Sequence, residues 1–125
     1  MDDVDTMAAL VIRERGGPVK SPDDAIWKTV IDRIGLRKAL LVAIRTKSMI
    51  ARCKFNEVYK THEEYRYRLG GVWHEPKFAW YIPSELKQLQ TYDNISDGTC
   101  PDCTAKMREQ MSQRRQERAR PTVNT

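Results

Sequence analysis

The sequence predicts an α+β domain that is mainly helical, with N-terminal helices packed as a hairpin, a short β-hairpin in the middle, and a CxxC turn leading into a basic C-terminal helix. Three observations support this fold class. Apolar residues recur at helical spacing through the first part of the chain. Gly70 and Gly71 separate two short runs that suit strands. Cys100 and Cys103 stand directly before a long segment free of glycine and proline.

The first helices are marked by their spacing and by their ends. Residues 6–15 carry apolar residues on one helical face, and Gly16 follows them. We expect the next helix to begin at Ser21, an N-cap residue, with Pro22 in the first helical position and two aspartates in the first turn. Its apolar face continues to Gly35, which can end a helix.

A further apolar pattern runs over residues 36–53, and we expect it to be helical with a break near 46–48. This segment and the preceding helix are predicted to pack together as a hairpin. Their apolar and glycine positions also resemble a helix-turn-helix motif, a resemblance that implies DNA recognition by residues 37–45. That stretch is mostly apolar and offers few side chains for reading base edges, which favours a helical hairpin in the core.

The middle of the chain favours strands. Residues 65–69 alternate, and with 72–74 they form the predicted β-hairpin, because two adjacent glycines can both adopt positive φ in a tight turn. We expect a further strand over 78–82, a short helix that begins at Pro83, and a polar loop over 91–99.

The CxxC motif is the most informative part of the sequence. A tight turn lets the thiolates of Cys100 and Cys103 bind one ion, and a Cys3His zinc site is completed by Cys53 with either His62 or His74. A CxxC whose second cysteine opens a helix resembles the second knuckle of zinc ribbons and treble-clef fingers, although the first CxxC of those families is absent. The alternative interpretation is that Cys100 and Cys103 are two reduced thiols in a loop and bind no zinc. No βαβ pattern surrounds the motif, which disfavours redox catalysis.

The positive charge is concentrated at the C-terminal end. We assign residues 1–103 to a single globular domain and 104–125 to a basic helix with a flexible tail; this second segment carries +4 of the net charge of +5. Cations so concentrated can bind phosphates through counterion release. The predicted nucleic-acid contacts are Lys106, Arg108, Arg114, Arg115, Arg118 and Arg120.

These features predict a small non-enzymatic regulatory protein, stabilised by zinc, that acts on DNA, on RNA or on a transcription complex. Common catalytic motifs of nucleotide-binding enzymes and hydrolases are absent from the sequence. The alternative is a protein–protein interaction module, an inhibitor or adaptor, with an interface built from Trp73, Trp80 and the apolar segment 36–50.

The expected location is the reducing cytoplasm. The acidic start of the sequence lacks the basic region of a secretory signal, and the three cysteines are too few for a disulfide framework. No run approaches the roughly 18–20 apolar residues of a membrane span.

Overall fold

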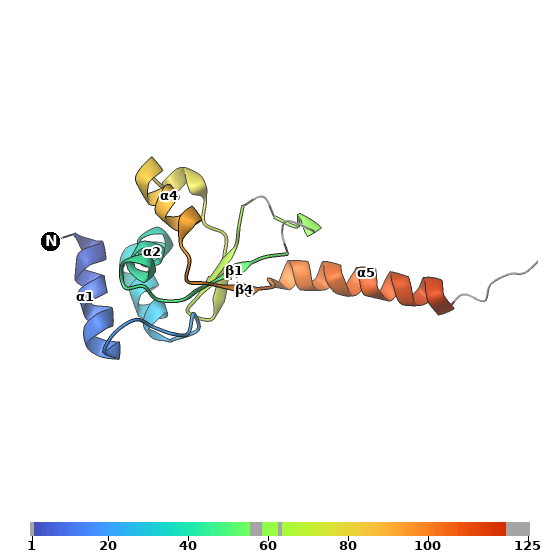
Figure 1. The fold of residues 1–125 in the computed structure, drawn as a ribbon, viewed down its shortest axis with the longest axis horizontal. Helices are drawn as coiled ribbons and strands as arrows, with labels where there is room; N and C mark the ends of the chain where they lie inside the picture. Colours follow the sequence, from blue (N-terminus) through green and yellow to red (C-terminus); the bar gives the residue numbers. More distant parts are fainter. Residues whose placement is uncertain (1, 56–58, 63, 120–125) are drawn as a thin grey trace, which may run out of the picture.

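The computed structural model describes residues 2–55, 59–62 and 64–119, and for 117–119 the backbone only. It is an α+β fold, as predicted. The helices are α1 (Asp3–Arg15), α2 (Ile26–Arg45), α4 (Pro83–Thr91) and α5 (Pro101–Ala119), with a 3-10 turn η1 at Phe78–Trp80. The strands are β1 (Ile50–Cys53), β2 (Tyr67–Leu69), β3 (Val72–His74) and β4 (Ile95–Gly98). In Figure 1, α1, α2 and α4 gather at one end, and α5 extends away from the other. No helix within the described ranges is long and apolar enough to cross a membrane.

Helices α1 and α2 pack side by side, which confirms the predicted hairpin of N-terminal helices, but its members differ from the expected pair. The two segments that were expected to pack together, 21–35 and 36–53, instead both contribute to α2. Ion pairs link α1 and α2 at both ends. Arg15, at the end of α1, binds both carboxylate oxygens of Asp24 just before α2. At the other end, Lys38 donates to Asp3 at 2.8 Å. The two helices therefore run antiparallel, with the last turn of one beside the start of the other.

The start of α2 differs from the prediction. The hydroxyl of Ser21 accepts from the backbone of Asp23 and forms a separate turn, and the helix begins only at Ile26. Asp24 takes the capping role, because its carboxylate accepts from the Ile26 N–H at 2.9 Å. Gly35 interrupts α2 with non-helical dihedrals and kinks it.

The second half of α2 belongs to the core. Its residues 39–43 are buried, and they pack against α1 and the sheet. The cations that a recognition helix would offer are paired instead, since Arg37 binds Glu85 at 2.6 Å and Arg45 binds Asp5. The structure therefore favours a role in the core for residues 37–45 over DNA recognition.

Two segments that were expected to be helix and loop are strands. The helix predicted to continue to Cys53 ends at Arg45, and Ile50–Cys53 forms β1 instead. Lys47 there adopts a left-handed φ of 57°, which an α-helix cannot accommodate. The polar loop predicted over 91–99 contains β4, which pairs parallel to β1. The two wrong predictions have the same cause. Strands β1 and β4 stabilise each other by pairing, although they are far apart in the sequence.

The sheet has the order β3-β2-β1-β4. The predicted β-hairpin is confirmed, with both Gly70 and Gly71 at positive φ between β2 and β3. The further strand predicted over 78–82 is wrong, since Phe78–Trp80 forms η1. The predicted short helix is α4, which begins at Pro83.

Candidate metal centre

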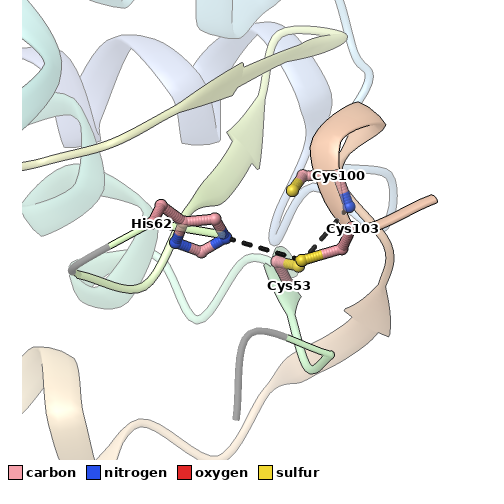
Figure 2. A group of neighbouring side chains, drawn as sticks. All are labelled: Cys53, His62, Cys100 and Cys103. Carbon is pink, nitrogen blue, oxygen red and sulfur yellow. Dashed lines mark hydrogen bonds between the residues drawn. The ribbon is translucent and has the colours of Figure 1, made fainter. Parts of the chain in front are cut away.

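Four side chains from three separate parts of the chain meet beside the sheet. They are Cys53, His62, Cys100 and Cys103, and their potential ligand atoms all lie within 4.8 Å of one another. Figure 2 shows the three sulfurs and the imidazole facing a common centre. A tetrahedral zinc ion with metal–sulfur bonds near 2.3 Å separates its sulfur ligands by roughly 3.8 Å. The four atoms therefore need to close by no more than about 1 Å to reach that geometry, so the cluster can hold a metal ion such as zinc.

The sheet register brings the first cysteine to the CxxC motif. Strands β1 and β4 are parallel, and Cys53 lies opposite Gly98. Because both strands end at the same edge, the chain after β4 places Cys100 close to Cys53, and the Cys100 N–H donates to the Cys53 sulfur at 3.4 Å. Helix α5 then begins at Pro101 and places Cys103 in its first turn. The second cysteine of the motif opens a helix, as the sequence predicted.

The imidazole comes from the segment between β1 and β2. Lys60 has a φ of 51°, a conformation that a residue with a side chain adopts only at some cost, and it turns the chain just before Thr61 and His62. The Nδ1–H of His62 donates to the Glu64 carbonyl at 2.5 Å. A carbonyl can only accept, so this bond leaves Nε2 as the unprotonated nitrogen. That atom lies 3.9 Å from the Cys103 sulfur, on the side of the cluster.

Each of the three sulfurs also has a hydrogen-bond donor of its own. The Thr61 hydroxyl lies 3.1 Å from the Cys103 sulfur, and Arg66 donates to the Cys100 sulfur at 3.6 Å. The Cys53 sulfur accepts from the backbone N–H of Cys100. Such donors orient thiolates and offset their charge in metal sites. All four candidate ligands thus have a partner that holds them in place.

The environment acts unequally on the pKa values of two of the thiols. Burial raises the pKa of Cys100, but the backbone N–H of Cys103, the neighbouring thiols and Arg66 outweigh it and hold that pKa below its ordinary value. At Cys103, burial and the two other cysteines raise the pKa to about 11, although the hydrogen bond with Thr61 lowers it. Cys100 is therefore the readier thiolate, and a bound cation would favour loss of the Cys103 proton.

Arg66 connects the cluster to its surroundings. Besides Cys100, its guanidinium binds Asp102 at 2.5 Å and lies 3.5 Å from Glu75. The backbone of β1 determines its position, because the Cys53 N–H donates to the Arg66 carbonyl at 2.9 Å. A zinc ion with three thiolates and a neutral imidazole carries one negative charge in excess. Arg66 is placed to offset that charge while holding the first turn of α5.

The cluster is closed to solvent on its sulfur side. Cys53, Cys100 and Cys103 are fully buried free thiols, and three partly buried aromatic rings pack against them. These rings belong to Phe55, Tyr59 and Trp73. A buried set of four protein ligands that leaves no position for substrate is typical of structural zinc sites.

The structure brings together four of the five metal-site residues considered from the sequence. His74 is the exception, because β3 carries it away from the cluster and its Nε2 lies 3.2 Å from the Leu69 carbonyl. Thr61, Glu64 and Arg66 support the cluster and were not singled out for it from the sequence. Arg66 belongs to the alternating run 65–69. Its hydrogen bond to the Cys100 sulfur depends on the pairing of β1 with β2, which no local pattern in the sequence shows.

The predicted nucleic-acid contacts lie along α5. Lys106, Arg108, Arg114 and Arg115 are exposed. Only the backbone of Arg118 is described, and Arg120 lies outside the described residues. The interface of the alternative interpretation is partly lost, because residues 39–43 of its segment 36–50 are core and Trp73 packs against the cysteine cluster.

Comparisons of the chain with protein-family models, with curated proteins and with solved structures each gave no match. A functional interpretation therefore has to come from the chemistry of the residues themselves.

Proposed function

We propose that this chain is a zinc-stabilised, non-enzymatic regulatory protein that binds nucleic acid through the basic helix α5. The observation that carries the proposal is the closed Cys3His cluster at the root of that helix. Cys53, His62, Cys100 and Cys103 would hold the ion, which would supply a fixed junction between the sheet and α5. No ligand position remains for a reacting water, which supports a structural and not a catalytic ion.

The position of the cations supports the second half of the proposal. Helix α5 extends away from the body, and four of its basic side chains are exposed to solvent. Cations on a projecting helix can approach a polyanion without collision with the rest of the domain. Their attraction to phosphates should weaken steeply as salt increases, because binding releases condensed counterions.

Two measurements on the full chain test the proposal. The metal content of protein purified without chelator should be about one zinc ion per chain, and Cys100→Ser should abolish it. Fluorescence anisotropy at low salt should show binding to DNA or RNA, and replacement of Arg108, Arg114 and Arg115 by glutamine should remove that binding. Protein that contains zinc but binds no nucleic acid at low salt would contradict the nucleic-acid half alone.

A protein–protein interaction module remains the second candidate, and one observation favours it. Trp80 and Ile82 are 50% and 56% exposed, on either side of the buried Tyr81. Aromatic side chains of this kind often anchor protein interfaces. Trp80→Ala should weaken capture of a partner in that case, while it should leave binding of DNA or RNA unchanged if the first candidate is correct. The free thiols and the reduced metal ligands also fit a reducing location, which we propose to be intracellular.

A further inference from the structure

The arginines of α5 share one side of the helix. With 3.6 residues per turn, Arg108 and Arg115 lie two turns apart on the same face, roughly 10 Å along the axis. Met111 falls between them, and Arg114 borders the same face. The spacing puts Lys106 and Glu109 on the opposite side, where they form an ion pair at 3.8 Å. We call the first side the arginine face, defined by Arg108, Met111, Arg114 and Arg115; Arg118 falls on it by its position in the sequence.

We infer that the arginine face of α5 enters the major groove of double-stranded DNA. This inference rests on the proposed nucleic-acid function and names its partner. The arginine face would be turned toward the bases and phosphates, and the face of Lys106 and Glu109 would be turned outward. Glu109 is then kept away from the phosphates, which would repel it.

The exposure of α5 leaves the arginine face accessible from Met111 onward. Near the root of the helix, Thr104, Met107 and Gln110 are half-buried on the same side as the arginine face, because they precede Arg108, Met111 and Arg114 by four residues. From Met111 to Gln116 every side chain is exposed, so the described part of the chain covers no face of the helix there. A helix that is polar all round and packs on nothing gains little from its own burial. A partner that contacts this part of the helix would therefore add most of its tertiary stabilisation.

Charge complementarity identifies the partner as a polyanion. Arginines grouped on one face repel one another, and Arg114 and Arg115 both stand at helical-neighbour spacing from Arg118 in the sequence. A row of phosphates removes that repulsion. The planar guanidinium of arginine also forms bidentate hydrogen bonds to phosphates and to guanine in a fixed geometry, whereas lysine is a compact point charge on a flexible stem.

The shape of α5 favours duplex DNA over other nucleic acids. The major groove of B-form DNA is about 12 Å wide and accepts an α-helix, whereas the major groove of A-form RNA is too narrow and deep. Single strands are usually held by stacking on aromatic rings. The described part of α5 carries no aromatic residue. Met111, which is 47% exposed in the middle of the arginine face, offers an apolar contact for a thymine methyl group.

The test compares two single-charge substitutions in the full zinc-loaded chain. Arg115→Gln removes a cation from the arginine face, and Lys106→Gln removes one from the opposite face. Circular dichroism should show the same helix content in both. With a mixed-sequence DNA duplex as probe, Arg115→Gln should weaken binding about 5–10-fold and reduce the salt slope by about one. Lys106→Gln should change the affinity less than about twofold.

The same binding measurement is repeated with two further probes, duplex RNA and single-stranded DNA of the same sequence. Both should bind more weakly than duplex DNA, and tighter binding of either one overturns the choice of partner. Equal losses from Arg115→Gln and Lys106→Gln would overturn the arginine face as the contact. Each of these results leaves the proposed nucleic-acid function standing. Failure of all three probes to bind at low salt would instead refute that function, and this inference with it.

Discussion

The helical layer and the metal centre are stabilised by different forces. In the helical layer, buried side chains of α1 and α2 pack against one another and against β1 and β2. In the metal centre, the buried residues are three cysteines, and only three partly buried rings accompany them. The first region has enough apolar surface to fold by burial. The second has little, and instead it gathers three thiols and an imidazole that could hold a metal ion. One domain thus combines an apolar core with a region that a bound ion would stabilise.

The largest effect is expected from removal of a metal ligand. Cys53→Ser should abolish zinc binding and release the start of α5, because the ion would be the main connection between β1 and that helix. Hydrogen exchange should show loss of protection in 61–66 and 100–110, while α1 and α2 remain protected. Addition of a chelator to the unmodified protein should reproduce this pattern. Equal loss of protection in α1 would show that the two regions are not separable.

The next largest effect concerns the helical layer. Leu40 is fully buried in α2, and Leu40→Ala should lower the free energy of unfolding by roughly 2–5 kcal/mol through lost burial and a cavity. Thermal unfolding should report the loss as a lower Tm. The zinc affinity of the folded protein, measured by chelator competition well below Tm, should stay unchanged. A parallel drop in that affinity would mean that the core positions the ligands directly.

A smaller effect is expected from the residue that connects the regions. Arg66→Gln removes the donor to Cys100 and the ion pair with Asp102, and it should lower zinc affinity about 10–100-fold, as is usual for partners of metal ligands. The matched control is Arg15→Gln, since Arg15 pairs with Asp24 in the helical layer, apart from the cluster.

Both arginine variants should be loaded with Co²⁺ as well, to compare the spectra of the thiolate ligands. Arg15→Gln should retain both the affinity and the spectrum of the unmodified protein. If the two variants bind zinc equally well, Arg66 has no role at the metal centre.

The smallest effect is a pH dependence confined to the helical layer. The hydrogen bond from Arg15 and that from the Ile26 N–H hold the pKa of Asp24 below its ordinary value, against a smaller effect of burial. A lowered pKa contributes stability above the unfolded pKa of about 4, and this contribution is lost as the pH falls through the folded value. Asp24→Asn should therefore lower the stability at neutral pH by about 1 kcal/mol and flatten its decline below about pH 4. Urea unfolding between pH 3 and 7 measures this, with the exposed Asp32→Asn as the control.

The metal ligands divide between what the sequence could predict and what it could not. The CxxC spacing identified Cys100 and Cys103 as a pair, since a turn of four residues is a local property. Cys53 and His62 were candidates only because few other cysteines and histidines exist. The choice of His62 over His74 depended on where the fold carries each side chain, since a left-handed turn at Lys60 precedes His62 and β3 carries His74 away from the cluster.

The sequence by itself determined the local structure of this protein: an α+β fold, the tight turn at Gly70 and Gly71, and a CxxC motif that opens a basic helix. Each of these depends on residues within a few positions of one another. Only the tertiary structure decided that Ile50–Cys53 and Ile95–Gly98 are parallel strands. The second of these contains serine, aspartate and glycine, and it has little strand propensity of its own. Its pairing across the sheet imposes the extended conformation, and the same pairing carries Cys53 to the CxxC turn and creates the metal centre.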